Sequence, residues 1–242
     1  MNTKLLSAAI LVLTVLCVYP ALTSEQSTGR LAAEVKLTSA QSAGLKPIRL
    51  LQPQMDGGRP LMQVLKDRKT SRAFSSEKLP MQVLSNMLWA AWGVNRPESG
   101  KRTAPSAMNW QEIDVYVALA DGLYLYDAKA HILELVLAED IRAATGLQAF
   151  VKDAPVNLVF VTDLSRMGGV PADQKDFYSA ADTGFISQNV YLYCASEGLA
   201  TVVRGYVDRP ALAKVMKLRP DQKVILAQTV GYPKKHRAPD IR

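Results

Sequence analysis

Ile113-Asp114-Val115-Tyr116-Val117-Ala118-Leu119 is the stretch that decides the fold class. Its apolar side chains recur at every second position, which is the period of a β-strand with two different faces. Asp121-Gly122 and a second alternating run, Leu123-Tyr124-Leu125-Tyr126, follow it. An Asp-Gly pair between two such runs is a strong hairpin signal, so two antiparallel strands are expected over residues 113–126.

The chain around this hairpin predicts more strands and several helices. A nearly unbroken β-branched and apolar run after Pro155 indicates a buried strand, and Gly93 and Gly198 mark the ends of two helices. Hairpins combined with a strand buried on both faces favour an α+β fold, with a central, mainly antiparallel sheet flanked by helices. The expected helices cover 80–92, 180–197 and about nine residues from 210, and the further strands cover 156–161, 201–203 and 224–230.

The first 24 residues are predicted to be a secretory signal peptide. Lys4 is the only charge, residues 5–18 are apolar, and small residues follow the break at Tyr19-Pro20. A retained membrane anchor is the alternative, but this run of about 14 residues is shorter than the roughly 20 that a spanning helix needs. We therefore expect cleavage near Thr23 or Ser24, no stable membrane anchor, and a secreted or periplasmic protein.

The remaining chain is expected to form a spacer or arm over 25–59 and one domain over 60–242. The formal net charge of +7 is scattered rather than gathered in blocks, so no nucleic-acid partner is expected. Cys194 lies in an apolar run and is predicted to be a buried core residue. His131 and His236 are the only histidines, too few for a typical metal site, so no metal is expected.

Two basic clusters and one turn of small residues are candidates for chemistry. Arg68-Lys69-Thr70-Ser71-Arg72 combines three cations with two hydroxyls, and such groups bind phosphate through charge-assisted hydrogen bonds. Lys234-Lys235-His236-Arg237 brackets the domain at its other end. Between them, Arg102-Thr103-Ala104-Pro105-Ser106-Ala107-Met108-Asn109 lets the backbone approach a flat ring. Each segment alone also fits an ordinary solvated surface, and the combination is what favours a shared anion.

These segments carry a family resemblance that covers nearly everything from residue 60 to residue 239. Five segments resemble the nitroreductase superfamily in matching order: Arg68-Lys69-Thr70-Ser71-Arg72-Ala73-Phe74, Leu88-Trp89-Ala90-Ala91-Trp92-Gly93, residues 102–109, Gly198-Leu199-Ala200-Thr201 with Arg204-Gly205, and Val230-Gly231-Tyr232-Pro233. The Pro105 turn and the hairpin after it look like the branch of azoline-oxidising, SagB-type dehydrogenases. The resemblance implies an α+β fold, a homodimer, and FMN bound at the subunit interface.

The resemblance also implies roles for individual residues in holding FMN. No side chain is assigned a catalytic role, because the cofactor performs the hard chemistry and the protein supplies placement and electrostatics. The FMN phosphate would be held by Arg68, Lys69, Thr70 and Arg72, with Lys235 and Arg237 from the other side. The flavin ring would contact Pro105, Ser106, Ala107 and Asn109 of the second subunit. The reactive edge of the ring would face Val203, Arg204 and Gly205.

The expected function is FMN-dependent hydride transfer to or from a small conjugated substrate, such as a nitroaromatic or a quinone. Phe177 and Tyr178, in a segment where the family varies its substrate-facing lid, are the candidate substrate contacts, although packing in the dimer core is slightly favoured for them. The azoline-oxidising branch implies an adjacent Lys-Tyr pair, which Lys175 and Tyr178 do not form. For an exported enzyme the electron donor would be a redox partner protein or a membrane quinol. A flavin-binding module without turnover is the alternative function.

Overall fold

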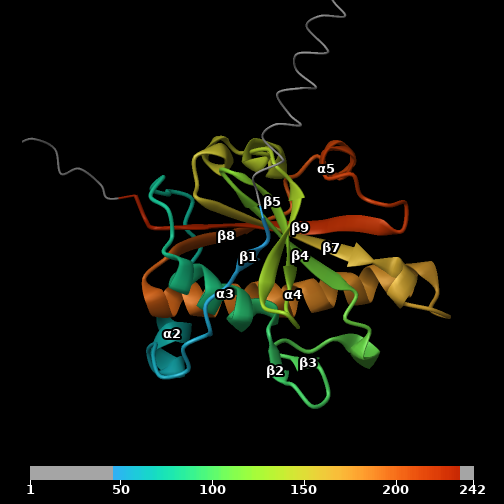
Figure 1. Cartoon of the computed structure of the whole chain (residues 1–242), viewed down its shortest axis with the longest axis horizontal. Helices are drawn as coiled ribbons and strands as arrows, with labels where there is room; N and C mark the ends of the chain where they lie inside the picture. The colour runs from blue at the N-terminus through green and yellow to red at the C-terminus, as the bar shows by residue number, and fades with distance from the viewer. Residues whose placement is uncertain (1–45, 235–242) are drawn as a thin grey trace, which may run out of the picture. The chain divides into compact units, whose positions relative to one another are not determined.

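A computed structural model describes residues 46–234 of the chain and confirms the predicted fold class. The predicted signal peptide, residues 25–45 of the predicted arm, Lys235 and Arg237 lie outside the described residues. Seven strands form one sheet in the order β1-β6-β5-β4-β7-β9-β8, and every neighbouring pair is antiparallel (Figure 1).

The described chain combines strands of this sheet with helices and a small second sheet. The sheet strands are β1 Ile48–Arg49, β4 Ile113–Leu119, β5 Gly122–Asp127, β6 Ile132–Leu137, β7 Val156–Asp163, β8 Ala200–Arg204 and β9 Gln222–Gly231, and β2 Val94–Arg96 pairs with β3 Lys101–Arg102. The α-helices are α2 Leu61–Asp67, α3 Met81–Trp92, α4 Ala172–Glu197 and α5 Arg209–Val215, and the short 3-10 helices are η1 Ala107–Asn109, η2 Arg142–Thr145, η3 Ala149–Lys152 and η4 Leu164–Arg166.

The predicted hairpin is β4 and β5, with a turn one residue earlier than the Asp-Gly pair indicates. Leu119 pairs with Gly122, so Ala120 and Asp121 form the turn and Gly122 begins β5. A side chain at Gly122 would meet the carbonyl oxygen of Leu137 at 2.6 Å, which explains glycine inside a strand. On its other side β4 pairs with β7, which is buried along its whole length as predicted.

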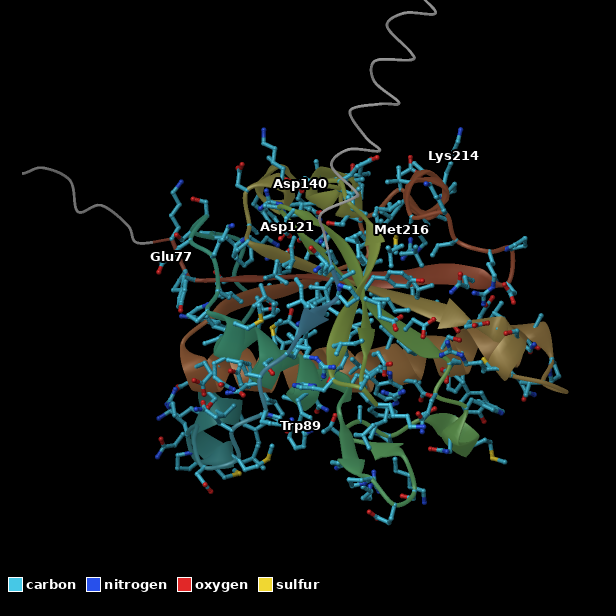
Figure 2. All side chains as sticks on the ribbon, viewed as in Figure 1. Glu77, Trp89, Asp121, Asp140, Lys214 and Met216 are labelled. Carbon is cyan, nitrogen blue, oxygen red and sulfur yellow. The ribbon has the colours of Figure 1, made fainter. Side chains whose placement is uncertain are left out.

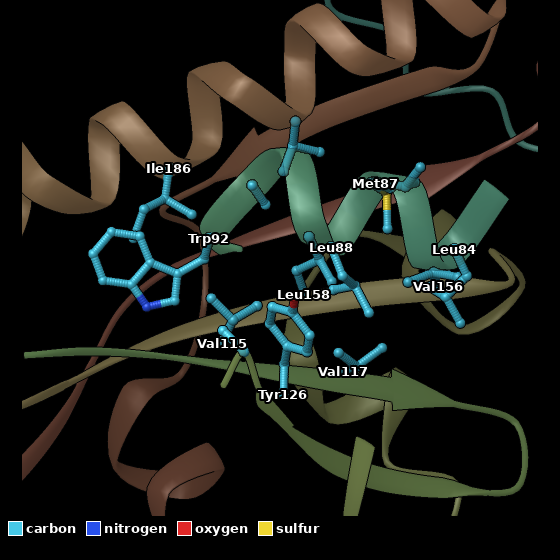
Figure 3. Packing of buried hydrophobic residues seen from close by; sticks show 14 of the residues in the cluster. Leu84, Met87, Leu88, Trp92, Val115, Val117, Tyr126, Val156, Leu158 and Ile186 are labelled. Atoms are coloured by element: carbon cyan, nitrogen blue, oxygen red, sulfur yellow. The ribbon is translucent and has the colours of Figure 1, made fainter. Parts of the chain in front are cut away.

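Helices α3 and α4 pack on one face of the sheet and bury the larger core. Leu88 and Trp92 of α3 and Ile186 of α4 contact sheet residues such as Val115 and Leu158 (Figure 3). The free thiol of Cys194 is buried in this core as predicted, and burial raises its pKa. The left-handed conformation of Gly198, with φ of 69°, ends α4 where the sequence predicts.

The predicted beginning of α4 is wrong by eight residues. The sequence indicates a helix from Ala180, whereas α4 begins at Ala172 directly after Pro171. In the added turns the buried position is the polar Ser179, and Phe177 is 68% exposed. This inverts the usual amphipathic pattern, so apolar periodicity gives no signal there.

A second core covers the opposite face of the sheet. Helix α5 begins after Asp208, whose carboxylate accepts the amide of Ala211, and Pro210 lies in its first turn as predicted. Met216 is buried against the sheet just after α5, while Lys214 projects away from the fold (Figure 2). This helix is seven residues long rather than about nine.

Residues 46–59, the described part of the expected arm, lie against the domain. β1 pairs with β6 through Ile48 and Leu133, and the Gln54 amide donates to Asn86 Oδ1 at 3.0 Å. His131 fixes the same segment, since its Nε2 lies 2.9 Å from the carbonyl oxygen of Leu51. Within residues 46–234, no helix combines the length and the apolar character needed to cross a membrane.

Candidate functional site

The predicted basic loop at residues 68–72 lies beside β8 and beside the end of β9. The amide of Ser71 donates to the carbonyl of Thr201 at 2.9 Å, and the amide of Lys234 donates to the carbonyl of Ala73 at 3.1 Å. Figure 1 shows the chain after α2 and the end of β9 on the same side of the molecule. Backbone hydrogen bonds therefore join the first basic cluster to the chain that leads into the second.

Tyr191 of α4 connects this loop to β8. Its hydroxyl accepts the amide of Val203 at 3.0 Å and lies 3.0 Å from Thr70 Oγ1, which is thus free to accept its proton. The guanidinium of Arg68 lies 5.3 Å from the centre of the Tyr191 ring. Sequence reasoning missed this residue because it is 121 positions from Thr70 and occupies an ordinary place in a helical pattern.

A cavity of about 490 Å³ opens between the loop, α4 and β8. Lys69, Ser71, Tyr191 and Lys234 are among the residues that line it. The side chains of Lys69 and Arg72 are exposed, and no carboxylate of residues 46–234 forms an ion pair with either. Asp67 also lines the cavity, but its carboxylate pairs with Arg59, so the exposed cations beside the hydroxyl groups still suit this edge of the fold to an anion.

The segment after β8 is open at Gly205, whereas the side chain of Arg204 is buried. A Cβ at Gly205 would come no closer than 3.8 Å to protein atoms, so packing within the chain does not require glycine there. The Arg204 guanidinium donates to Thr145 O at 2.7 Å, to Thr229 Oγ1 at 3.0 Å and to Asn157 Oδ1 at 3.2 Å. Burial lowers its pKa to about 10. These hydrogen-bond partners place the Arg204 side chain on the sheet face opposite the one that α4 covers.

The small-residue turn before β4 has a strained backbone. Met108, Asn109 and Gln111 have φ angles of 50°, 57° and 49°, in the left-handed region that non-glycine residues seldom adopt. Ser106 Oγ accepts the amide of Gln111 at 2.9 Å, and the Gln111 side-chain amide donates to Asn109 Oδ1 at 3.0 Å. Pro105 is exposed at the start of this turn.

Two buried carboxyl groups that sequence reasoning missed hold the same turn. Ser106 Oγ donates to Glu112 Oε2 at 3.2 Å, and the Ala107 amide donates to Asp182 Oδ2 at 2.9 Å. Glu112 is fully buried and Asp182 is 2% exposed. Burial, with the charge of the adjacent Asp182, raises the pKa of Glu112 to about 7. These carboxyl groups are 70 positions apart, and no local pattern joins them.

Comparison with known proteins shows the family of the chain. The model of the nitroreductase family matches residues 65–232, which is more than half of the chain. The chain belongs to the nitroreductase family. It is 31% identical over 169 residues to "Putative nitroreductase MJ1384" of Methanocaldococcus jannaschii, covering 66% of this chain and 85% of that protein. Membership in this family supports an oxidoreductase.

Solved structures of the nitroreductase fold are similar to the chain. A "putative nitroreductase" of Ralstonia eutropha JMP134 is 48% identical, with a TM-score of 0.76 over 79% of this chain and 91% of that one. The microcin synthetase McbBCD complex of E. coli is 18% identical, with a TM-score of 0.61 over 77% of this chain and 79% of that one. The latter shows only a shared fold.

The predicted substrate contacts of this nitroreductase lie near the 106–111 turn, on the first half of α4. The Tyr178 ring is 5.5 Å from the Trp110 ring and 5.4 Å from the Phe177 ring. Lys175, on the same helix, donates from its Nζ to the carbonyl of Leu164 at 3.1 Å. Aromatic faces thus gather beside the turn expected to contact the ring.

The turn and the basic loop contact α4 at different points of one subunit. The turn bonds to Asp182, and the loop meets Tyr191, nine positions further along the helix. At 1.5 Å per residue this separation is roughly 13 Å along the helix axis. Figure 1 likewise shows η1 near the other end of α4 from the basic loop.

Proposed function

We propose that this nitroreductase is an exported FMN-dependent oxidoreductase that transfers two electrons, as hydride, to or from a small conjugated substrate. The carrying observation is a cavity of about 490 Å³ that Lys69 and Lys234 help to line, where the chain after the basic loop is hydrogen-bonded to Lys234 at the end of the described residues. A nitroaromatic or a quinone is the proposed substrate class, because Trp110, Phe177 and Tyr178 place aromatic rings at the 106–111 turn.

The basic loop fits a phosphate group. A phosphate monoester carries up to two negative charges and three acceptor oxygens, and Lys69, Arg72 and the hydroxyl of Thr70 are suitable donors. Arg68, held over the Tyr191 ring, adds positive charge behind them. We include Lys235 and Arg237 in the proposed site, because they follow Lys234 directly in the sequence.

The segment from Val203 to Gly205 fits the edge of a ring system. Gly205 leaves the backbone uncovered, as a close approach by a flat ligand requires. Bound FMN would supply the two-electron chemistry, and the chain would place the ring, exclude water and direct backbone dipoles at it. Arg204 contributes positive charge from below the surface, since its guanidinium is enclosed by neutral acceptors.

We propose that the site is completed by a second subunit. Within one chain the turn that bears Pro105, Ser106, Ala107 and Asn109 lies about 13 Å along α4 from the basic loop. Exposed apolar side chains on η1 and α4 are available for an interface, and such patches commonly mark one. They are Met108 (82% exposed), Phe177 (68%) and Phe185 (47%).

Export sets the expected electron donor. The apolar residues 5–18 after Lys4 support a signal peptide, and nicotinamide cofactors are scarce outside the cytoplasm. We propose a redox partner protein or a membrane quinol as the physiological reductant.

The test is flavin binding and turnover by the purified mature protein. It is expected to carry flavin absorbance and, after reduction with dithionite, to be reoxidised faster by a quinone or nitroarene than by buffer. Arg72→Ala is expected to weaken FMN binding by about 10- to 100-fold, the size of one lost charged hydrogen bond. Lys214→Ala removes an exposed cation on the opposite face and is the matched control. A colourless protein that takes up no FMN would refute the proposal.

A further inference from the structure

Two carboxyl groups hold two consecutive residues of one strained turn. Glu112, just before β4, accepts the hydroxyl of Ser106, and Asp182 of α4 accepts the amide of Ala107. Both side chains are buried. Because several residues of the turn have positive φ, its shape depends on bonds to surrounding groups. These carboxyl groups supply two such bonds.

The pair has no cationic partner. Arg102, from β3, donates to Gln111 Oε1 at 2.7 Å, and Arg166, from η4, donates to the carbonyl of Gln111 at 2.8 Å. Arg166 also pairs with Asp114 at 2.9 Å and with Asp163 at 3.5 Å. Within the described chain no Lys, Arg or His forms an ion pair with either buried carboxyl group.

One proton resolves this arrangement. Burial and the neighbouring Asp182 carboxylate both disfavour the ionised form of Glu112, so Glu112 keeps a proton up to neutral pH. Glu112 Oε1 has no hydrogen-bond partner among residues 46–234, which leaves it available to carry that proton. The neighbouring buried groups on β7 and α4, Thr162 and Ser179, are not titratable and bond to each other at 2.8 Å.

We propose that Glu112 keeps a proton beside the Asp182 carboxylate, and that this proton fixes the 106–111 turn and thereby positions the surface offered to the flavin ring. The ring contact rests on the proposed function, whereas the coupling between proton and turn does not. Loss of the proton leaves two negative charges side by side. Their repulsion separates the two carboxylates and, with them, displaces Ser106 and Ala107, which are bonded to them. Both carboxyl groups act as positioning residues.

Trp110 is the reporter for the apoprotein, because it lies in the turn and its ring packs on Tyr178. With 5-fluorotryptophan incorporated, the ¹⁹F resonance of Trp110, assigned from Trp110→Phe, is expected to titrate with a midpoint near neutral pH. In Glu112→Gln the amide mimics the protonated acid, and the titration should vanish. Asp182→Asn should lower the midpoint, because it removes the negative charge beside Glu112. Asp176→Asn, which alters an exposed carboxylate of the same helix, is the control and should titrate as wild type.

A Trp110 resonance that stays fixed from pH 5.5 to 8.5, or one that still titrates normally in both Glu112→Gln and Asp182→Asn, would overturn the coupling. Circular dichroism checks that each variant is folded. If one of the two variants does not fold, the other alone tests the coupling.

FMN affinity gives the second readout. The FMN affinity of wild type is divided by that of Glu112→Gln at each pH, which cancels the titration of the FMN phosphate. This ratio is expected to fall about tenfold between pH 6 and 8.5, as a change of one unit in the pKa of Glu112 on FMN binding implies. An unchanged ratio would refute the link to the ring. A protein that binds no FMN at all would refute the proposed function and leave the ¹⁹F titration as the test of the coupling.

Discussion

Tyr191 shows how one side chain can organise a site that residue types alone do not reveal. Its hydroxyl takes the amide of Val203 and faces Thr70, so the strand beside the expected ring and the loop beside the expected phosphate share one anchor. The loop at 68–72 was predictable from its cations and hydroxyls. Tyr191, Glu112 and Asp182 were not, because their significance comes from partners distant in sequence.

Tyr191→Phe is expected to reduce the free energy of unfolding by about 1 to 2 kcal/mol, since the Val203 amide loses its acceptor. Urea denaturation of the apoprotein measures it. Tyr206→Phe, at a side chain 64% exposed, is the matched control and should stay within about 0.5 kcal/mol of wild type. Equal losses in both variants would show that the Tyr191 hydroxyl has no special role.

The raised pKa of Glu112 implies that the free energy of unfolding depends on pH. Its pKa is raised in the folded protein to about 7, so the unfolded chain releases this proton at lower pH than the folded one does. The free energy of unfolding should therefore fall as pH rises from about 4.5 to 7, by about 1.4 kcal/mol for each pKa unit. Glu112→Gln should flatten that fall in urea titrations at several pH values. The control is Glu134→Gln, at an exposed position of β6; a fall unchanged by Glu112→Gln would contradict the assignment.

At the scale of elements, Gly198 determines where α4 ends and β8 begins. Its φ of 69° is costly for any residue with a Cβ, although nothing lies within 4 Å of that position. Gly198→Ala is expected to cost about 1 to 2 kcal/mol through backbone strain alone. Gly184→Ala, inside α4 and equally uncrowded, should instead stabilise the protein by about 0.5 to 1 kcal/mol. Thermal unfolding of both variants tests the pair, and shifts of the same sign would contradict it.

The sequence predicted the elements whose signal is local. α3, the β4–β5 hairpin and β7 each carry a clear apolar period or a buried run, and all three are confirmed. β1, two residues long, exists only through its pairing with β6, so nothing in its own residues announces it. The early turns of α4 were missed because they bury a serine and expose a phenylalanine.

For the whole molecule, the proposed homodimer would bring the 106–111 turn of one subunit to the basic loop of the other. Phe185→Asp places a charge on the exposed apolar face of α4 and is expected to yield a monomer with weakened FMN binding. Analytical ultracentrifugation measures the mass. Val215→Asp makes the same change on α5, where the side chain is 40% exposed, and should remain dimeric. A monomeric wild type that still binds FMN tightly would contradict the shared site.

The central claim is that the two basic clusters bind the phosphate of FMN while its flat ring lies against β8. Titrating the apoprotein with FMN and with riboflavin, which lacks only the phosphate, tests it most directly. The account predicts that FMN binds at least about 100-fold more tightly, as the loss of two or more charged hydrogen bonds implies. Equal affinity for the two flavins, or no binding of either, would contradict it.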